Sequence, residues 1–181
     1  MDPDPVWSDC DQIRIAGQPI SHTCAQMLRR GAVLDAPQGQ FTAISVGYAH
    51  ACALRTDRTA ACWGDNTDGQ LEVPDGEYTA IDVAYYGRGC ALRTDKTAAC
   101  WGRDGAELAE AINNQGRFTA VSAGDENVCG VRTDDSAVCV YDSSDYVAEL
   151  EGAYGKKGPF ATVDTPDRAG CGLFVDGTAV C

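Results

Sequence analysis

From residue 41 onward, apolar and polar residues alternate in short runs that are rich in Val, Ile, Thr and Ala. Gly and Asp interrupt these runs about every eight to twelve residues. Alternation with a period of two, bounded by turn-forming residues, is typical of short antiparallel strands rather than helices. The pattern therefore predicts an all-β fold.

One short phrase of the sequence occurs almost twice, as CALRTDRTAACWG from Cys52 to Gly64 and as CALRTDKTAACWG from Cys90 to Gly102. Twelve of the thirteen positions are identical. The apolar runs that precede the copies give periods of 37, 40 and 42 residues, because they begin at Phe41, Tyr78, Phe118 and Phe160. Periods of this length suit a propeller blade or a helical solenoid, and the strand pattern favours the blade.

The first forty residues are interpreted as a degenerate fifth copy. Cys10 and Cys24 precede the stretch 31–37, which can be laid over residues 69–74. These cysteines are fourteen residues apart instead of ten, and an insertion near Gly17 accounts for the difference. We expect one domain over the whole chain, divided into a degenerate unit 1–40, complete units 41–77, 78–117 and 118–159, and an incomplete unit 160–181.

The register of the repeated phrase follows if Cys52 lies opposite Cys62. Residues 56–58 then form a three-residue loop, a hairpin type whose last position takes a positive φ and favours Gly. Only the last copy has Gly there, at Gly177, and a positive φ should cost up to about 1 kcal/mol each at the equivalent Arg58, Lys96 and Asp135. Because Cys, Leu and Ala then share one face and Ala, Arg and Thr the other, we expect hairpins buried on one face only.

The ten cysteines fall into five equivalent pairs. We predict a disulfide in each pair: Cys10 with Cys24, Cys52 with Cys62, Cys90 with Cys100, Cys129 with Cys139 and Cys171 with Cys181. Because a disulfide needs closely spaced Cβ atoms, each pair should occupy a non-hydrogen-bonded site of its hairpin. Free thiols and zinc ligands are the alternatives, but paired zinc ligands usually lie about two to four residues apart and no CxxC or HxxxH occurs. Disulfides in this number indicate an oxidising compartment.

Charge and hydropathy narrow the function classes further. The chain carries 14 basic and 27 acidic residues, a formal net charge of -13, which argues against nucleic-acid binding as the main function. No apolar run approaches the roughly 18 residues of a membrane-spanning helix, and the start Met1-Asp-Pro-Asp-Pro does not resemble a signal peptide. We therefore expect a mature exported form, without its signal, in an extracellular, periplasmic or cell-surface location.

The residues between the copies resemble a known repeat. They include a Trp-Gly at Trp63, an Asp-Gly-Gln at Asp68 and a Val-Pro at Val73, and the next unit begins Tyr78-Thr-Ala-Ile-Asp-Val. These signatures resemble the regulator of chromosome condensation superfamily, most closely the bacterial branch that includes β-lactamase inhibitory protein II. The resemblance covers residues 41–181 and implies a β-propeller in which each unit forms a blade of four short strands. The branch it resembles has seven blades, whereas this sequence supplies about five repeats, four clear and one degenerate, so the chain is either a ring of five or a piece of something larger. We expect the chain ends to complete one another in a closed ring of five blades.

The loop between the first strand and the first cysteine is the most variable part of each copy. A constant frame with a changing loop is what a recognition surface requires, and Tyr and Arg are enriched in binding hot spots. The resemblance implies the same site, since in the inhibitor branch the corresponding loops carry the aromatic contacts to the partner enzyme. We therefore predict partner-binding roles for Tyr48, His50, Tyr85, Tyr86, Arg88, Asp125, Glu126 and Asn127. Packing of the tyrosines against the next blade is the alternative.

Three further features are interpreted as parts of the framework. Trp63 and Trp101 recur at one position, so we expect their rings to pack between blades with the indole N–H bonded. The loop 65–69 is rich in Asp and Asn but lacks the Glu that ends an EF-type calcium loop, and Asx turns explain it without a metal. The segment 103–112 is expected to form one helical turn.

No catalytic motif is present in the sequence. The two histidines, His22 and His50, have no Ser or Cys nucleophile arranged with them by motif, and a disulfide cysteine is not a thiolate. We therefore predict a secreted, non-catalytic protein-binding module without cofactor or metal, in its sharpest form an inhibitor of a hydrolase. A structural or cell-surface propeller fragment, for assembly or carbohydrate binding, is the alternative. Nucleotide exchange on a small GTPase ranks third, because that nuclear role conflicts with the disulfides.

Overall fold

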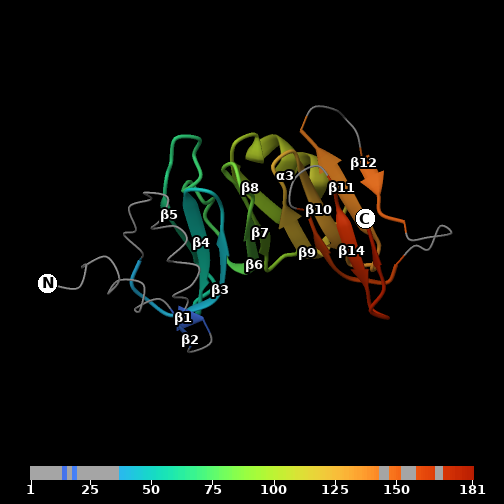
Figure 1. Cartoon of the computed structure of the whole chain (residues 1–181), viewed down its shortest axis with the longest axis horizontal. Coiled ribbons are helices and arrows are strands. Elements are labelled where there is room, and N and C mark those ends of the chain that lie inside the picture. The colour runs from blue at the N-terminus through green and yellow to red at the C-terminus, as the bar shows by residue number, and fades with distance from the viewer. Residues whose placement is uncertain (1–13, 16–17, 20–36, 143–146, 152–157, 166–168) are drawn as a thin grey trace, which may run out of the picture.

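The computed structural model describes residues 14–15, 18–19, 37–142, 147–151, 158–165 and 169–181. Over these residues the chain is built almost entirely of short strands, with one helix. Figure 1 shows the strands gathered into sheets that stand side by side in chain order, with the earliest sheet at one end of the row and the last at the other. The predicted all-β fold is confirmed.

Each of the four sheets contains one clear copy of the repeat, and we number them blades 1 to 4. Blade 1 contains β3 (Phe41–Val46), β4 (His50–Arg55) and β5 (Ala60–Gly64). Blade 2 contains β6 (Tyr78–Val83), β7 (Arg88–Arg93) and β8 (Ala98–Gly102). Blade 3 contains β9 (Phe118–Ala123), β10 (Asn127–Arg132), β11 (Ala137–Tyr141) and β12 (Val147–Glu149). Blade 4 contains β13 (Phe160–Asp164), β14 (Cys171–Phe174) and β15 (Ala179–Val180).

The element after the third strand differs among the copies, so the prediction of four short strands holds for blade 3 alone among the described residues. In blade 2 the helix α3 (Gly105–Asn113) follows β8 in place of a strand. Its nine residues exceed the single turn that the sequence suggested. Leu108 and Ile112, one turn apart, are both buried in the core between blades 2 and 3, and this packing stabilises the longer helix.

The chain before blade 1 adds a small hairpin to that blade. β1 (Arg14–Ile15) pairs antiparallel with β2 (Gln18–Pro19) and parallel with β3. Most of the predicted degenerate copy, including Cys10 and Cys24, lies outside the described residues. The described blades form an open row in Figure 1, so the predicted closed ring of five blades is not seen among them.

The hairpin of the repeated phrase has the predicted register. In blade 1, Cys52 lies opposite Cys62 and Leu54 opposite Ala60. The positive φ falls at the expected position of each copy, with values of 71°, 68°, 66° and 85° at Arg58, Lys96, Asp135 and Gly177. The Asp before this position accepts bonds from the N–H and the hydroxyl of the residue after it, as in the 2.7 Å bond from Thr59 Oγ1 to Asp57 Oδ1, and each copy repeats the pattern.

Four of the five predicted disulfides are present, and the fifth lies outside the described residues. The bonded pairs are Cys52–Cys62, Cys90–Cys100, Cys129–Cys139 and Cys171–Cys181. Their Cα atoms are 4.0 to 4.1 Å apart. This separation suits a non-hydrogen-bonded pair, for which about 4.5 Å is usual against about 5.5 Å for a hydrogen-bonded one.

The prediction that the hairpins are buried on one face only is wrong for blades 2 and 3 and for β4 of blade 1, whereas β14 of blade 4 alternates between buried and exposed residues. β4, β7 and β10 are buried at every residue except the last. The reason is that the blades stack face to face. Cys52 and Leu54 of blade 1 share one core cluster with Tyr78, Ile81 and Ala91 of blade 2. The small Ala side chains on the second face let the neighbouring blade approach closely, so both faces are removed from water.

The turn residue with positive φ also links neighbouring blades. The carbonyl of Arg58 accepts the N–H of Tyr78 at 2.8 Å, and that of Lys96 accepts the N–H of Phe118 at 2.9 Å. The hairpin of blade 3 makes the same bond to blade 4. The positive φ, which is unfavourable within the hairpin, therefore points the carbonyl of the turn residue at the next blade. The hydrogen bond that results offsets part of the free-energy cost of the positive φ.

The first strands of successive blades are joined through their side chains. Asp82 in β6 accepts bonds from Ser45 Oγ in blade 1 at 2.9 Å and from Ser122 Oγ in blade 3 at 2.8 Å. The backbone N–H of Ala123 also donates to Asp82, at 2.9 Å. Thr165 N then donates to Ser122 Oγ at 3.1 Å, so a continuous line of hydrogen bonds runs from blade 1 to blade 4.

Replacing Gly177 with Ala isolates the cost of the positive φ. A Cβ built at Gly177 meets no atom within 4 Å, so the substitution causes no clash. We expect Gly177→Ala to lower the free energy of unfolding by roughly 1 kcal/mol, measured from the midpoint of urea unfolding. Lys96→Gly makes the opposite change at the equivalent position and should raise that free energy by a similar amount. Identical midpoints for the two variants and the parent chain would contradict this explanation of the hairpin.

Candidate protein-binding surface

The strand order brings two separate segments of each copy to one edge of the blade. Because the three strands are antiparallel, the loop after the first strand and the segment after the third strand lie at the same end. In blade 1 the N–H of Asp65, just after β5, donates to Ala49 O in the β3–β4 loop at 2.8 Å. In blade 2 the N–H of Arg103 donates to Gly87 O at 3.3 Å. The variable loops therefore share one surface with the segments that follow β5 and β8.

Three of the predicted binding residues form an exposed aromatic cluster, which we name the tyrosine surface. Tyr48, Tyr85 and Tyr86 are 48%, 43% and 64% exposed. The ring centroids of Tyr48 and Tyr85 are 5.2 Å apart, and those of Tyr85 and Tyr86 are 4.9 Å apart with the rings edge to face. The N–H of Tyr48 donates to Tyr85 O at 2.8 Å, which joins the loops of blades 1 and 2.

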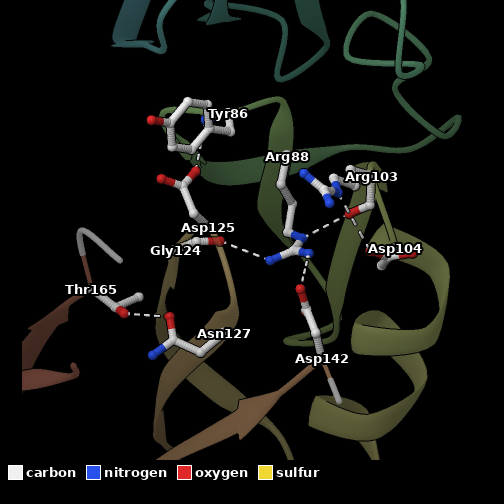
Figure 2. Close-up of polar contacts among 9 residues, drawn as sticks. All are labelled: Tyr86, Arg88, Arg103, Asp104, Gly124, Asp125, Asn127, Asp142 and Thr165. Carbon is white, nitrogen blue, oxygen red and sulfur yellow. Dashed lines mark hydrogen bonds and ion pairs between the residues drawn. The ribbon is translucent and has the colours of Figure 1, made fainter. Parts of the chain in front are cut away.

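Asp125 and Glu126 lie in the equivalent loop of blade 3 and are half-buried. Asp125 Oδ1 accepts the backbone N–H of Tyr86 at 2.7 Å (Figure 2). The carbonyl of Glu126 accepts the N–H of Asp142 at 3.0 Å. Asp125 therefore adjoins the tyrosine surface and holds the backbone of its most exposed member, whereas the carbonyl of Glu126 bonds to Asp142.

Arg88 lies inside the molecule, only 2% exposed, at the start of β7. Figure 2 shows its guanidinium between the loops of blades 2 and 3. Nε donates to Arg103 O at 2.9 Å and Nη1 donates to Gly124 O at 2.8 Å. Nη2 forms an ion pair with Asp142 at 2.8 Å. With its donors directed at these three partners, the buried Arg88 side chain fastens blade 3 to blade 2 and is not offered to solvent.

His50 and Asn127 are also buried, at 1% and 0% exposure. Asn127 Oδ1 accepts the hydroxyl of Thr165 at 2.6 Å, a bond from blade 3 to blade 4 that Figure 2 shows. Among the described residues, neither His50 Nε2 nor Asn127 Nδ2 has a hydrogen-bond partner. Asn127 therefore belongs to the contacts between blades, as Arg88 does.

The prediction that His50, Arg88 and Asn127 belong to the exposed loops is wrong. Each begins the second strand of its blade, two residues before the first cysteine. Side chains alternate along a strand, so these residues lie on the same face as the cysteine. That face packs against the next blade, as Cys52 does against blade 2. The constant distance from the cysteine is the signal by which the sequence could have identified them as buried.

A cavity of about 180 Å³ adjoins the tyrosine surface between blades 1 and 2. It is lined by Tyr48, Ala49, His50, Asp65, Asp68, Gln70, Tyr85, Tyr86 and Gly87. Burial lowers the pKa of His50, and the charge of Asp65 opposes only part of this effect, so the imidazole is neutral at pH 7. The hydroxyl of Thr67 is the main cause that lowers the pKa of Asp65, so this carboxylate is ionised. The cavity therefore carries negative charge.

The loop that supplies Asp65 and Asp68 was predicted to consist of Asx turns. Asp65 Oδ2 accepts bonds from Thr67 Oγ1 at 2.7 Å and Gln70 Nε2 at 3.0 Å. Asn66 Oδ1 accepts the N–H of Leu71 at 2.9 Å. Local hydrogen bonds thus account for this run of Asp and Asn. Its place beside the variable loop was missed, although the order of three antiparallel strands implies that both segments leave the blade at one end.

Trp63 and Trp101 are both buried, at 5% and 4% exposure. Trp101 packs in the core shared by blades 1 and 2, as its repeated position indicated. Trp101 Nε1 donates to Gln70 O at 2.8 Å, which fixes the end of the Asp65 loop. The indole N–H of Trp63 has no partner among the described residues. The expectation of a bonded N–H is therefore confirmed for Trp101 alone in that part of the chain.

Three comparisons with known proteins bear on this chain. Residues 41–70 match the profile described as the regulator of chromosome condensation (RCC1) repeat. A search of curated proteins found no match. The chain is similar to the ectodomain of the receptor kinase CR4 from Physcomitrella patens, with a TM-score of 0.60 and 24% identity, over 79% of this chain and 38% of that chain.

Two further solved structures resemble the fold. The CRINKLY WD40 ectodomain of the Arabidopsis thaliana receptor kinase ACR4 has a TM-score of 0.60 and 24% identity, over 82% of this chain and 51% of that chain. Yeast RCC1 (Prp20), whose structure was solved bound to Kap60, has a TM-score of 0.55 and 13% identity, over 81% of this chain and 44% of that chain. The fold is therefore that of an RCC1-like repeat propeller. The chain spans about half, or less, of the length of these proteins.

The described part of the chain lacks two kinds of feature. It contains no helix that is long and apolar enough to cross a membrane. It also contains no group of three or more His, Cys, Asp or Glu side chains that could hold a metal ion.

The role of Arg88 in joining the blades is tested by comparing two arginine variants. Arg88→Met leaves Asp142 and two carbonyls without their donor, and losing three hydrogen bonds of a guanidinium that is only 2% exposed should cost about 3 kcal/mol. Arg103→Met removes an exposed side chain whose contact with Asp104 spans 3.9 Å, so its effect should stay within about 0.5 kcal/mol. Urea unfolding measures both. If Arg88→Met were as stable as Arg103→Met, the buried guanidinium would not hold the blades together.

Proposed function

We propose that this chain is a secreted, non-catalytic module that binds another protein through the tyrosine surface. The observation that carries the proposal is the cluster of three exposed, mutually contacting tyrosine rings on the edge of an otherwise well-buried frame. Tyrosine is enriched among the residues that contribute most to binding energy. Its ring offers a large apolar area with a polar tip, which suits a surface that is wet when free and covered when bound.

The backbone beneath the cluster is already ordered for binding. The N–H of Tyr48 is bonded to blade 2 and the N–H of Tyr86 to blade 3. Two rings also contact Tyr85 directly. A surface held in this way loses less conformational freedom on association than a flexible loop, so more of the contact energy appears as affinity.

Secretion is supported by the disulfides. Four bonded pairs are present in the described residues, and structural disulfides persist in oxidising compartments rather than in the cytosol. Two of the similar solved structures are ectodomains of receptor kinases. We therefore assign the chain to an extracellular, periplasmic or cell-surface environment.

In its sharper form, the proposal is that the partner is an enzyme, such as a hydrolase, and that the tyrosine surface blocks its cleft. The support is the sequence resemblance to the bacterial branch that includes β-lactamase inhibitory protein II. A non-catalytic role is consistent with the chemistry of the site. Its histidine, His50, is buried, no Ser, Thr or Cys is among the described residues that line its cavity, and the cysteines of the described blades are bonded.

One observation favours the alternative of a propeller fragment that assembles with further blades. Leu173 on the cysteine face of blade 4 is 41% exposed, whereas the equivalent Leu54 and Leu92 are each 5% exposed beneath the next blade. Asp164, at the repeat position of Asp82, is also exposed. A further copy of the repeat would cover both residues. Sedimentation of the chain over a range of concentrations distinguishes a monomer from such an assembly.

The double variant Tyr85→Ala with Tyr86→Ala tests the proposed binding surface. A partner is first isolated from the secreted fraction of the producing organism with the parent chain, and its affinity is then measured for each variant. We expect the double variant to weaken binding on the order of tenfold or more.

Val175→Ala is the matched control for this experiment. Val175 is 63% exposed and follows β14 at the hairpin end of blade 4, away from the tyrosine surface. Its truncation should leave the affinity unchanged. If the tyrosine double variant kept full affinity for the partner, the partner would not bind at the tyrosine surface.

A further inference from the structure

The cavity beside the tyrosine surface is lined by two carboxylates and, among the described residues, by no Lys or Arg. Asp65 accepts its side-chain hydrogen bonds from the neutral Thr67 and Gln70. Asp68 is exposed, and its carboxylate makes no hydrogen bond or ion pair with any described residue. None of the ion pairs among the described residues includes either aspartate. The described residues around the cavity therefore do not neutralise its charge.

His50 is a second and independent feature of the same cavity. Its side chain is 1% exposed and lines the cavity, and Nε2 has no hydrogen-bond partner among the described residues. An unpaired polar atom at this depth is costly unless something binds to it. A neutral imidazole with its proton on Nδ1 presents Nε2 as an acceptor. His50 thus adds a hydrogen-bond acceptor to the cavity and no positive charge.

The aromatic wall of the cavity also favours a cation. Tyr48, Tyr85 and Tyr86 all line it, and their rings contact one another with centroid distances of 5.2 and 4.9 Å. The face of an aromatic ring attracts a cation that lies within about 6 Å of its centre. Carboxylates, an imidazole acceptor and aromatic rings are all complementary to a positively charged hydrogen-bond donor.

We infer that this cavity receives a single Lys or Arg side chain of the protein that the tyrosine surface binds. The inference rests on the proposed function and names the chemistry of the partner residue at its centre. In the bound state the cationic head lies between Asp65 and Asp68, donates to His50 Nε2 and is flanked by the tyrosine rings.

The size of the cavity supports a side chain rather than a free metabolite. Its volume of about 180 Å³ is below the roughly 300 Å³ at which small-molecule pockets begin. A guanidinium or ammonium head on an aliphatic stem fits such a space, and the stem packs on the tyrosine rings. The formal net charge of -13 on the chain favours the approach of a basic surface.

The inference is tested on the full chain with small probes that carry one side chain each. The cationic probes are the N-acetyl methylamides of lysine and arginine, and the norleucine and glutamate compounds serve as neutral and acidic controls. Binding is followed from the NMR resonances of the tyrosine rings. We expect saturable shifts at Tyr48, Tyr85 and Tyr86 with the two cationic probes only.

Three aspartate variants make the test specific. Asp68→Asn removes a charge from an exposed side chain without a hydrogen-bond partner among the described residues, and Asp65→Asn removes the second charge. Each should weaken binding of the arginine probe at least fivefold, and the double variant more. Asp75→Asn is the matched control, because Asp75 is exposed in the same copy but does not line the cavity. It should leave the affinity of the probe unchanged.

The outcomes separate this inference from the proposed function. The inferred cation site is wrong if neither cationic probe binds, or if Asp68→Asn and Asp75→Asn have the same affinity for the arginine probe. Either result would contradict the cation site even if the tyrosine double variant no longer binds the protein partner. If the cationic probes bind as expected but the tyrosine double variant keeps full affinity for the partner, the cavity binds cations and the proposed protein-binding surface is wrong.

Discussion

The carboxylate of Asp82 is the contact on which the arrangement of the blades most depends. It lies in the first strand of blade 2 and accepts bonds from Ser45 of blade 1 and from Ser122 and Ala123 of blade 3. One side chain therefore binds both neighbouring blades at once. A hydrogen bond to a charged group contributes about 1.5–3 kcal/mol, more than a bond between neutral groups. Ser45, Asp82 and Ser122 occupy one position of the repeat, so the link is a property of the repeat itself.

This link determines the geometry of the surface, because the variable loops begin just after it. Ser45 precedes Tyr48 by three residues, and Asp82 precedes Tyr85 by the same number. Arg88 then fixes the far side of the blade 2 loop through Gly124 and Asp142. The loops differ in sequence from copy to copy, and the loop of blade 2 is attached to the frame at both of its ends, through Asp82 and Arg88. The tyrosine surface is thus held by contacts between blades in addition to the bonds that close each loop, such as the one from Ala84 N–H to Arg88 O at 2.8 Å.

The hairpins could be predicted from the sequence because their constraints are local. Cysteine spacing sets the register, and the register dictates that Arg58, Lys96, Asp135 and Gly177 take a positive φ. The burial of both faces could not be obtained in this way, since it depends on blade-to-blade stacking between residues about forty positions apart. A strand with Ala on its second face has the same local pattern whether that face meets water or another blade.

The binding surface could be predicted only in part, because only some of its features follow from local sequence. The tyrosines were identified by their type and by the variability of their loops, both of which are local signals. Arg88 was assigned to the surface from its residue type, although its fixed distance from Cys90 marks it as a strand residue on the packed face. Asp65 and Asp68 were assigned to turns, and only the return of the third strand to the same edge brings them beside Tyr48.

Amide hydrogen exchange in Asp82→Ala tests most directly whether the frame between blades holds the surface. The account predicts faster exchange at Ala123, which loses its acceptor, and also at Tyr48 and Tyr86, whose N–H groups bond across neighbouring blades. The amides of the hairpin 52–62 should keep their protection, because the disulfide and the strand ladder of blade 1 remain. Faster exchange confined to Ala123, with Tyr48 and Tyr86 unchanged, would contradict the claim that contacts between blades position the binding surface.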